Sequence, residues 1–146
     1  MNLSKGIKVS VVEAAGAAAQ TDLTTDVLDM SGYEGVLFIA LLGDVTSGSV
    51  LTLTAKGNSA NSVSSPTPIT QKATGAFTAG ATSADSKVIM VDVYKPTLRY
   101  LFAVLSRTTQ DAIVGGIIAI QYGAHAKPTA QDASVIASAF GLGLAS

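Results

Sequence analysis

Apolar and polar residues alternate along much of this chain with a period of two, which is the period of a β-strand. The clearest case is the segment 49–56, where Leu51, Leu53 and Ala55 share one face and Thr and Lys residues share the other. This pattern predicts a half-buried strand that turns its apolar face towards a core.

Two further segments, 87–94 and 99–107, alternate less because they carry apolar residues on both faces. Strands buried on both sides have this composition, so we expect both to be central strands of a sandwich. A turn at 95–97 separates them, because Pro96 lacks the donor that a strand ladder needs.

Weaker patterns predict five more strands, which brings the total to about eight. They lie at 6–13, 22–30, 35–42, 69–77 and 112–122, and the fourth of them suits a sheet edge. The pair Gly115 and Gly116 interrupts the last strand, which indicates a bulge or a close backbone contact. The segments 57–68 and 74–86 are expected to be long loops, although the second could also form a strand pair. The whole pattern predicts an all-β chain with a jelly-roll-like β-sandwich fold.

The C-terminal segment does not continue the alternation. It is rich in Ala and Ser and ends on the apolar residues Phe140, Leu142 and Leu144. Thr129 or Asp132 could cap a short helix there. We therefore expect a sandwich domain over 1–128 and an extended arm over 129–146 that docks on its own domain or on a partner.

Charged residues make up 13% of the chain, about half of the ~25% usual in soluble domains, and the mean hydropathy is +0.44. Such a chain is expected to cover much of its surface. The net charge of −1 argues against nucleic acid and anionic membranes as partners. The longest apolar runs, 36–42 and 113–120, are far shorter than the ~20 residues of a membrane-spanning helix. Glu13 interrupts any signal-peptide pattern, so we expect an intracellular or assembly-bound protein.

Candidate chemistry is sparse. The chain has no Cys, which excludes disulfides and thiolate chemistry, and its single His125 has no ligand or catalytic partner near it in sequence. Asp22, Asp26 and Asp29 lack the spacing of a calcium loop and are expected to be ordinary turn and strand-edge charges. We expect no metal and no cofactor.

No feature of the sequence favours an enzyme. The fold could still bring two carboxylates together as the catalytic pair of a glycosidase. However, the chain has four Tyr, four Phe and no Trp, so few aromatic side chains are present to stack on a sugar. The glycine pairs at 115–116 and 141–143 lack the strand–loop–helix context of a phosphate site. The two arginines of the chain, Arg99 and Arg107, bracket one strand and are expected to share a face roughly 27 Å apart. They suit either interfacial salt bridges or solvated strand ends.

Three segments of the C-terminal half, 91–101, 107–116 and 119–124, are similar to small structural proteins of tailed-phage head modules. The shared pattern is a strand, the motif K-P-x-x-R-Y-L, a strand ending in Arg-x-Thr, and a strand ending in Tyr-Gly before a Pro-Thr tail. The resemblance covers about the last 60 residues. The first 85 residues resemble these proteins only in composition, with few charged residues and many small ones.

The resemblance implies a capsid cement, or decoration, protein with a jelly-roll or β-sandwich fold. Such proteins assemble as dimers or trimers on the capsid exterior, in the host cytoplasm, and clamp adjacent major capsid subunits. We expect no nucleic-acid or membrane partner. The candidate interface residues are Arg99, Tyr100, Arg107, Tyr122, Phe140, Leu142 and Leu144.

Two other interpretations stay open. One is a different virion part, such as a tail or head-completion protein of the same fold class. The other is a free-standing β-sandwich that binds a sugar or another ligand, which predicts a monomer with a pocket and a compact C-terminus.

Overall fold

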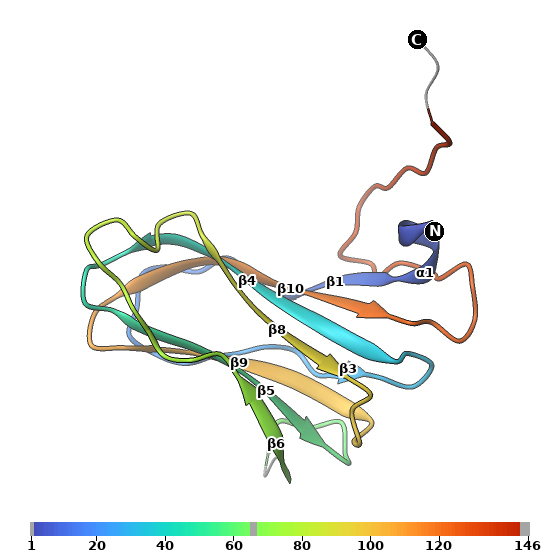
Figure 1. The fold of residues 1–146 in the computed structure, drawn as a ribbon, viewed down its shortest axis with the longest axis horizontal. Helices are drawn as coiled ribbons and strands as arrows, with labels where there is room; N and C mark the ends of the chain where they lie inside the picture. Colours follow the sequence, from blue (N-terminus) through green and yellow to red (C-terminus); the bar gives the residue numbers. More distant parts are fainter. Residues whose placement is uncertain (1, 65–66, 144–146) are drawn as a thin grey trace.

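Two antiparallel β-sheets lie face to face in the computed structural model, which describes residues 2–64 and 67–143 (Figure 1). The elements are α1 (Leu3–Gly6), β1 (Lys8–Glu13), β2 (Leu23–Thr24), β3 (Leu28–Asp29), β4 (Gly35–Val45), β5 (Val50–Asn58), β6 (Thr67–Ala73), β7 (Phe77–Thr78), β8 (Val88–Tyr94), β9 (Tyr100–Thr108) and β10 (Ala112–Tyr122). The predicted all-β sandwich is confirmed. The helix α1, a single turn, was not predicted.

The strand order follows a nested pattern. Sheet A has the order β1-β10-β4-β8, and sheet B has the order β2-β9-β5-β6, with β3 added on β9 and β7 added on β5. The pairs are nested along the sequence. From the outermost pair inwards they are β1 with β10, β2 and β3 with β9, β4 with β8, and β5 with β6 and β7. Successive pairs alternate between the two sheets. This arrangement is the jelly roll that the sequence predicted.

The core lies between the sheets and consists of every second residue of the long strands. Leu51, Leu53 and Ala55 of β5 point inwards and are buried, as their alternation predicted. The inner face of β4 contributes Phe38, which has no exposed surface. Burial of these side chains is the main stabilising term of the fold.

The strand β8 lies at the edge of sheet A, so the prediction that it is central was wrong. Its inner residues pack on the core, but Val88 and Met90 point outwards and are exposed. The apolar composition of both faces therefore reflects an apolar outer surface rather than a central position. The strand β9, in contrast, does lie inside sheet B, as expected.

The segment 22–30 forms two short strands instead of the single strand that was predicted. Between them, the hydroxyl oxygen of the buried Thr25 accepts the backbone N–H of Ala103 at 2.9 Å, and the N–H of Asp26 donates to the carbonyl of Val12 in the other sheet. A side chain thus replaces one ladder bond, and the backbone turns from one sheet towards the other.

The remaining boundaries differ in detail from the sequence pattern. The predicted edge strand at 69–77 is divided into β6 and β7, which both pair with β5. The loop 74–86 contains only β7 and no strand pair, whereas residues 65 and 66 of the loop 57–68 lie outside the described residues. The predicted bulge is confirmed, because the pairing of β10 with β4 shifts register at Gly116, whose φ is +133°.

Candidate functional site

The outer face of sheet A is apolar across all four strands. It consists of the side chains that alternate with the core positions: Val9 and Val11 of β1, Ile118 and Ile120 of β10, Leu37, Ile39 and Leu41 of β4, and Val88 and Met90 of β8. None of them belongs to the buried core, so the face is open in the chain described.

Strand register aligns these side chains in rows. One row runs straight across the sheet through Val11, Ile118, Ile39 and Met90, because each residue pairs directly with the next. Its two ends are 45% exposed at Val11 and 55% exposed at Met90. Directly opposed residues share a face, so the row forms a continuous apolar ridge.

The outer face of sheet B is more polar. Its central strand β5 presents Thr52, Thr54 and Lys56 outwards, and Ser106 of β9 lies opposite Thr52. The two faces of this sandwich therefore differ: one resembles an ordinary solvated surface, and the other resembles the side of a buried sheet.

A cluster of tyrosines closes one end of the apolar face. Gly35 lies between Tyr122 and Tyr94, and a Cβ on Gly35 would collide with the Tyr122 ring. The rings of Tyr122 and Tyr94 are stacked with their centroids 6.4 Å apart, and the Tyr122 hydroxyl donates to Asp92 Oδ1 at 2.5 Å. Burial, followed by this hydrogen bond, raises the pKa of Tyr122 above its usual value.

We expect one of the four tyrosines to ionise late in an alkaline titration monitored by tyrosinate absorbance. A raised pKa in the folded state means that Tyr122 stabilises the fold below the ordinary tyrosine pKa of ~10 and loses this contribution as the pH rises above it. Tyr122→Phe should remove the late step and lower the free energy of unfolding by about 1 kcal/mol. A single common step for all four tyrosines in the folded wild type would contradict this.

The C-terminal arm lies along the outer edge of β1. Gln131 Oε1 accepts the backbone N–H of Val9 at 2.8 Å, and Ser134 Oγ accepts that of Val11 at 2.9 Å. Thr129 Oγ1 donates to the carbonyl of Ile7 at 2.5 Å. Side chains of the arm therefore occupy backbone groups that an edge strand would otherwise leave open.

No helix forms in the described part of the arm, although Thr129 or Asp132 could have capped one. The Asp132 carboxylate accepts both the backbone N–H and the hydroxyl of Ser134, and these bonds lower the pKa of Asp132. This local loop competes with a helix for the same groups.

Beyond residue 134 the arm extends away from both sheets (Figure 1). Ile136 is 98% exposed, Leu142 is 80% exposed and Phe140 is 45% exposed. Leu144, the last of the predicted interface residues, lies outside the described residues. Three large apolar side chains on an extended segment are costly in water and suit a partner surface.

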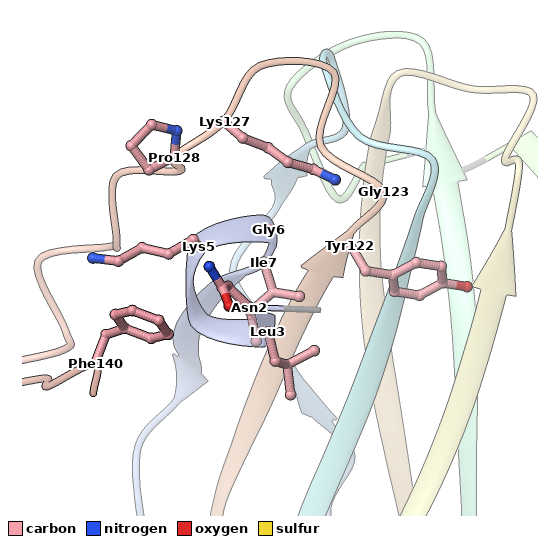
Figure 2. Close-up of a pocket in the computed structure, with 10 residues that line it drawn as sticks. All are labelled: Asn2, Leu3, Lys5, Gly6, Ile7, Tyr122, Gly123, Lys127, Pro128 and Phe140. Carbon is pink, nitrogen blue, oxygen red and sulfur yellow. The ribbon is translucent and has the colours of Figure 1, made fainter. Parts of the chain in front are cut away.

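Phe140 lies at the mouth of a groove of about 860 Å³ between α1, the start of the arm and the end of β10. Figure 2 shows the Phe140 ring beside Lys5, whose Nζ lies 5.6 Å from the ring centroid, with Leu3 and Ile7 further inside. The groove is therefore formed jointly by both ends of the described chain.

Arg99 and Tyr100 lie on the surface where β9 begins. Arg99 forms a two-pronged ion pair with Asp29, with Nη2 to Oδ2 at 2.8 Å and Nε to Oδ1 at 3.0 Å. The Arg99 guanidinium holds the pKa of Asp29 below its usual range, and the Ser31 N–H adds to this. The guanidinium also lies 5.2 Å from the Tyr100 ring centroid.

Arg107 is buried, unlike Arg99, so the two arginines do not form a common surface. Its Nε donates to the carbonyl of Thr21 at 2.8 Å, and its Nη1 donates to the carbonyl of Ala112 at 2.8 Å. A third carbonyl, that of Ala17, lies 3.4 Å from Nη1. In the described chain Arg107 thus fixes the loop before β2 instead of reaching a partner.

The remaining candidates are dispersed. His125 is exposed, as expected, while Asp22 and Asp26 are exposed and Asp29 is paired with Arg99. Within residues 2–64 and 67–143, no three Asp, Glu or His side chains gather as a metal site, and no helix is long and apolar enough to cross a membrane.

The apolar face itself was missed in the sequence. Its signal was present, because β4, β8 and β10 carry apolar residues at successive positions. In the sequence this signal was used only for the segment of β8, where it was interpreted as a central position in the sandwich. Only the strand order shows that one side of sheet A is covered by sheet B and that the other side is open.

Comparisons with known proteins find the fold but no family. No family model and no curated protein matches the chain. A solved structure that it resembles is that of the PBSX exported protein XepA, with a TM-score of 0.51 and 16% identity over 99% of this chain and 45% of XepA. The chain spans less than half the length of that protein. At this identity the likeness shows the fold alone.

Proposed function

We propose that this chain is a phage structural protein, specifically a cement or decoration protein that associates with itself and clamps adjacent major capsid subunits on the capsid exterior. The observation that carries the proposal is the arm, on which Ile136 and Leu142 are almost fully exposed and Phe140 is half exposed beside Lys5. A rigid body with a projecting apolar segment suits a clamp, and many copies on a lattice would add avidity.

Two further observations support the proposal, the first for a structural role and the second for a phage context. The charge content of 13% is low for a chain that remains separate in water, and the fold is shared with a protein of the phage PBSX. Because jelly rolls support many functions, the fold adds only the phage context.

The exposed candidates define where a capsid partner would bind. Arg99 and Tyr100 form one surface at the start of β9, and Phe140 and Leu142 lie on the arm. Arginine and aromatic side chains carry much of the binding energy in interfaces. Arg107 is left out of the proposed contact because it is buried.

Co-sedimentation with heads of the source phage, assembled without this chain, tests the proposal. The full chain should pellet with the heads. A variant that combines Ile136→Ser, Phe140→Ser and Leu142→Ser should bind at least about tenfold more weakly, because it lacks the apolar anchors of the arm. The matched control, Ala137→Ser with Ala139→Ser, changes the same segment and should bind as the wild type does. A full chain that stays in the supernatant would overturn the proposal.

A second candidate is a phage protein that acts outside the particle. The likeness to XepA, an exported protein of PBSX, favours this alternative. It predicts that the chain is absent from purified virions and accumulates in the medium, which quantitative mass spectrometry of the two fractions would distinguish.

A further inference from the structure

We infer that the outer face of sheet A is the surface through which two copies of this chain associate, face to face about a two-fold axis. The inference rests on the proposed function in one respect, which is that the chain associates with itself. It adds which surface the two copies share. In such a dimer the layers would follow the order sheet B, sheet A, sheet A of the second copy, sheet B of the second copy.

The composition of the face is that of an inner layer. Along β4 the outward residues Leu37, Ile39 and Leu41 are as apolar as the inward Phe38 and Leu42. A sheet with one solvated side normally alternates apolar and polar residues, whereas a sheet covered on both sides is apolar throughout. Sheet A therefore has the sequence of a sheet with a second covering layer, which the monomer does not supply.

The face is one continuous apolar surface that spans four strands. Val11, Leu41, Val88, Met90 and Tyr94 are between 45% and 59% exposed, and half-buried aliphatic side chains lie between them. Contiguous apolar patches larger than a few hundred Å² are rare on monomers and are typical of surfaces that a partner covers.

The charges of the face favour a second copy over a charged partner. In the row of Val9, Ile120, Leu37 and Asp92, the charged side chain is Asp92, and the Tyr122 hydroxyl already donates to it. The exposed Asp44 of β4 lies beyond the apolar rows, where the pairing of β4 with β10 shifts register, and so adds to the polar rim. Lys95 lies at the rim, with its Nζ 5.3 Å from the Tyr94 ring centroid. An apolar centre with a polar rim is self-complementary, since two identical copies place no like charges opposite each other at the centre.

The mass of the full chain in solution, measured by sedimentation equilibrium, tests the inference. The wild type should have a mass of about 29 kDa, twice the 14.7 kDa of one chain. Ile39→Lys places an ammonium group in the middle row between Ile118 and Met90, and it should weaken the dimer by at least about a hundredfold. Thr54→Lys is the matched control, because it puts the same group on the central strand of the opposite face.

Circular dichroism and the melting temperature establish whether each variant is folded. If Ile39→Lys does not fold, Met90→Lys replaces it, because Met90 is 55% exposed and its substitution disturbs no core contact. A folded variant of the face that remains dimeric, or a wild type that is monomeric, would overturn the inference. A dimer that does not pellet with phage heads would keep the inference and overturn the proposed function. A monomer that pellets would overturn the inference and the self-association, and would keep the proposed binding to the capsid.

Discussion

Arg107→Ala is expected to lower the free energy of unfolding by about 3–5 kcal/mol, because it removes two short hydrogen bonds donated by a charged group, each worth about 1.5–3 kcal/mol. The guanidinium holds the carbonyls of Thr21 and Ala112 at 2.8 Å each, and Thr21 Oγ1 lies 3.3 Å from Nη2. Without Arg107 the Ala112 carbonyl keeps, within the described residues, only the N–H of Ala19 at 3.4 Å, the exposed Thr21 loses its bond to β9, and the buried side chain leaves a cavity. Urea unfolding, followed by circular dichroism, measures the loss.

Arg99→Ala is the control for this prediction, because the two arginines flank the same strand. Arg99 and Asp29 are both largely exposed, so their ion pair is screened by water and its loss should change stability little. Arg107→Lys should also be destabilising, because an ammonium group cannot reproduce the fork of bonds to two carbonyls. Equal effects of the alanine changes at the two arginines would show that the buried network is not a main support of the loop.

Gly116→Ala is expected to destabilise the fold by about 2–3 kcal/mol, the range for a residue forced into an unfavourable backbone conformation. The φ of Gly116 is +133°, and a Cβ there would lie 3.2 Å from the carbonyl oxygen of Glu13 in β1. Backbone cannot move aside as a flexible side chain can, so both the strain and the contact persist. Thermal unfolding should report a melting temperature lower by several degrees.

The neighbouring Gly115 provides the control. It has no positive φ, and a Cβ on it would meet the Leu41 side chain at an ordinary 3.4 Å. Gly115→Ala should therefore be neutral or slightly stabilising, since alanine has less backbone entropy to lose than glycine. A loss of stability at residue 115 that equals the loss at residue 116 would contradict the explanation from the bulge.

Much of the fold could be predicted because buried and exposed residues alternate along a β-strand, which gives the sequence a period of two. Leu51, Leu53 and Ala55 were assigned to the core from alternation alone, and the structure buries all three. The same rule failed for β8, because alternation reports whether a face is apolar and not what covers it. Position within a sheet depends on pairings between residues far apart in the chain, which no local pattern contains.

The candidate interface was harder to predict for a related reason. Arg99 and Arg107 have the same residue type and lie on either side of one strand, yet one is on the surface and the other is enclosed by the segment 17–21. That segment has no periodic signal, so its path over the sheet could not be read from the sequence. Phe140 and Leu142 were selected because they are apolar residues outside any strand pattern, and their role in an interface stays a prediction.

The pairing of β1 with β10 sets the timing of folding during synthesis. Val9 pairs with Ile120, so sheet A cannot be completed until a strand about 100 residues later has been made. Translation of that interval takes roughly 5 to 20 s at ~5–20 residues per second, whereas β-sandwiches fold in about milliseconds to seconds once their strands are present. The rate of synthesis, rather than the search for the native pairing, therefore limits when this jelly roll folds. Until β10 has been synthesised, β1 has no partner strand.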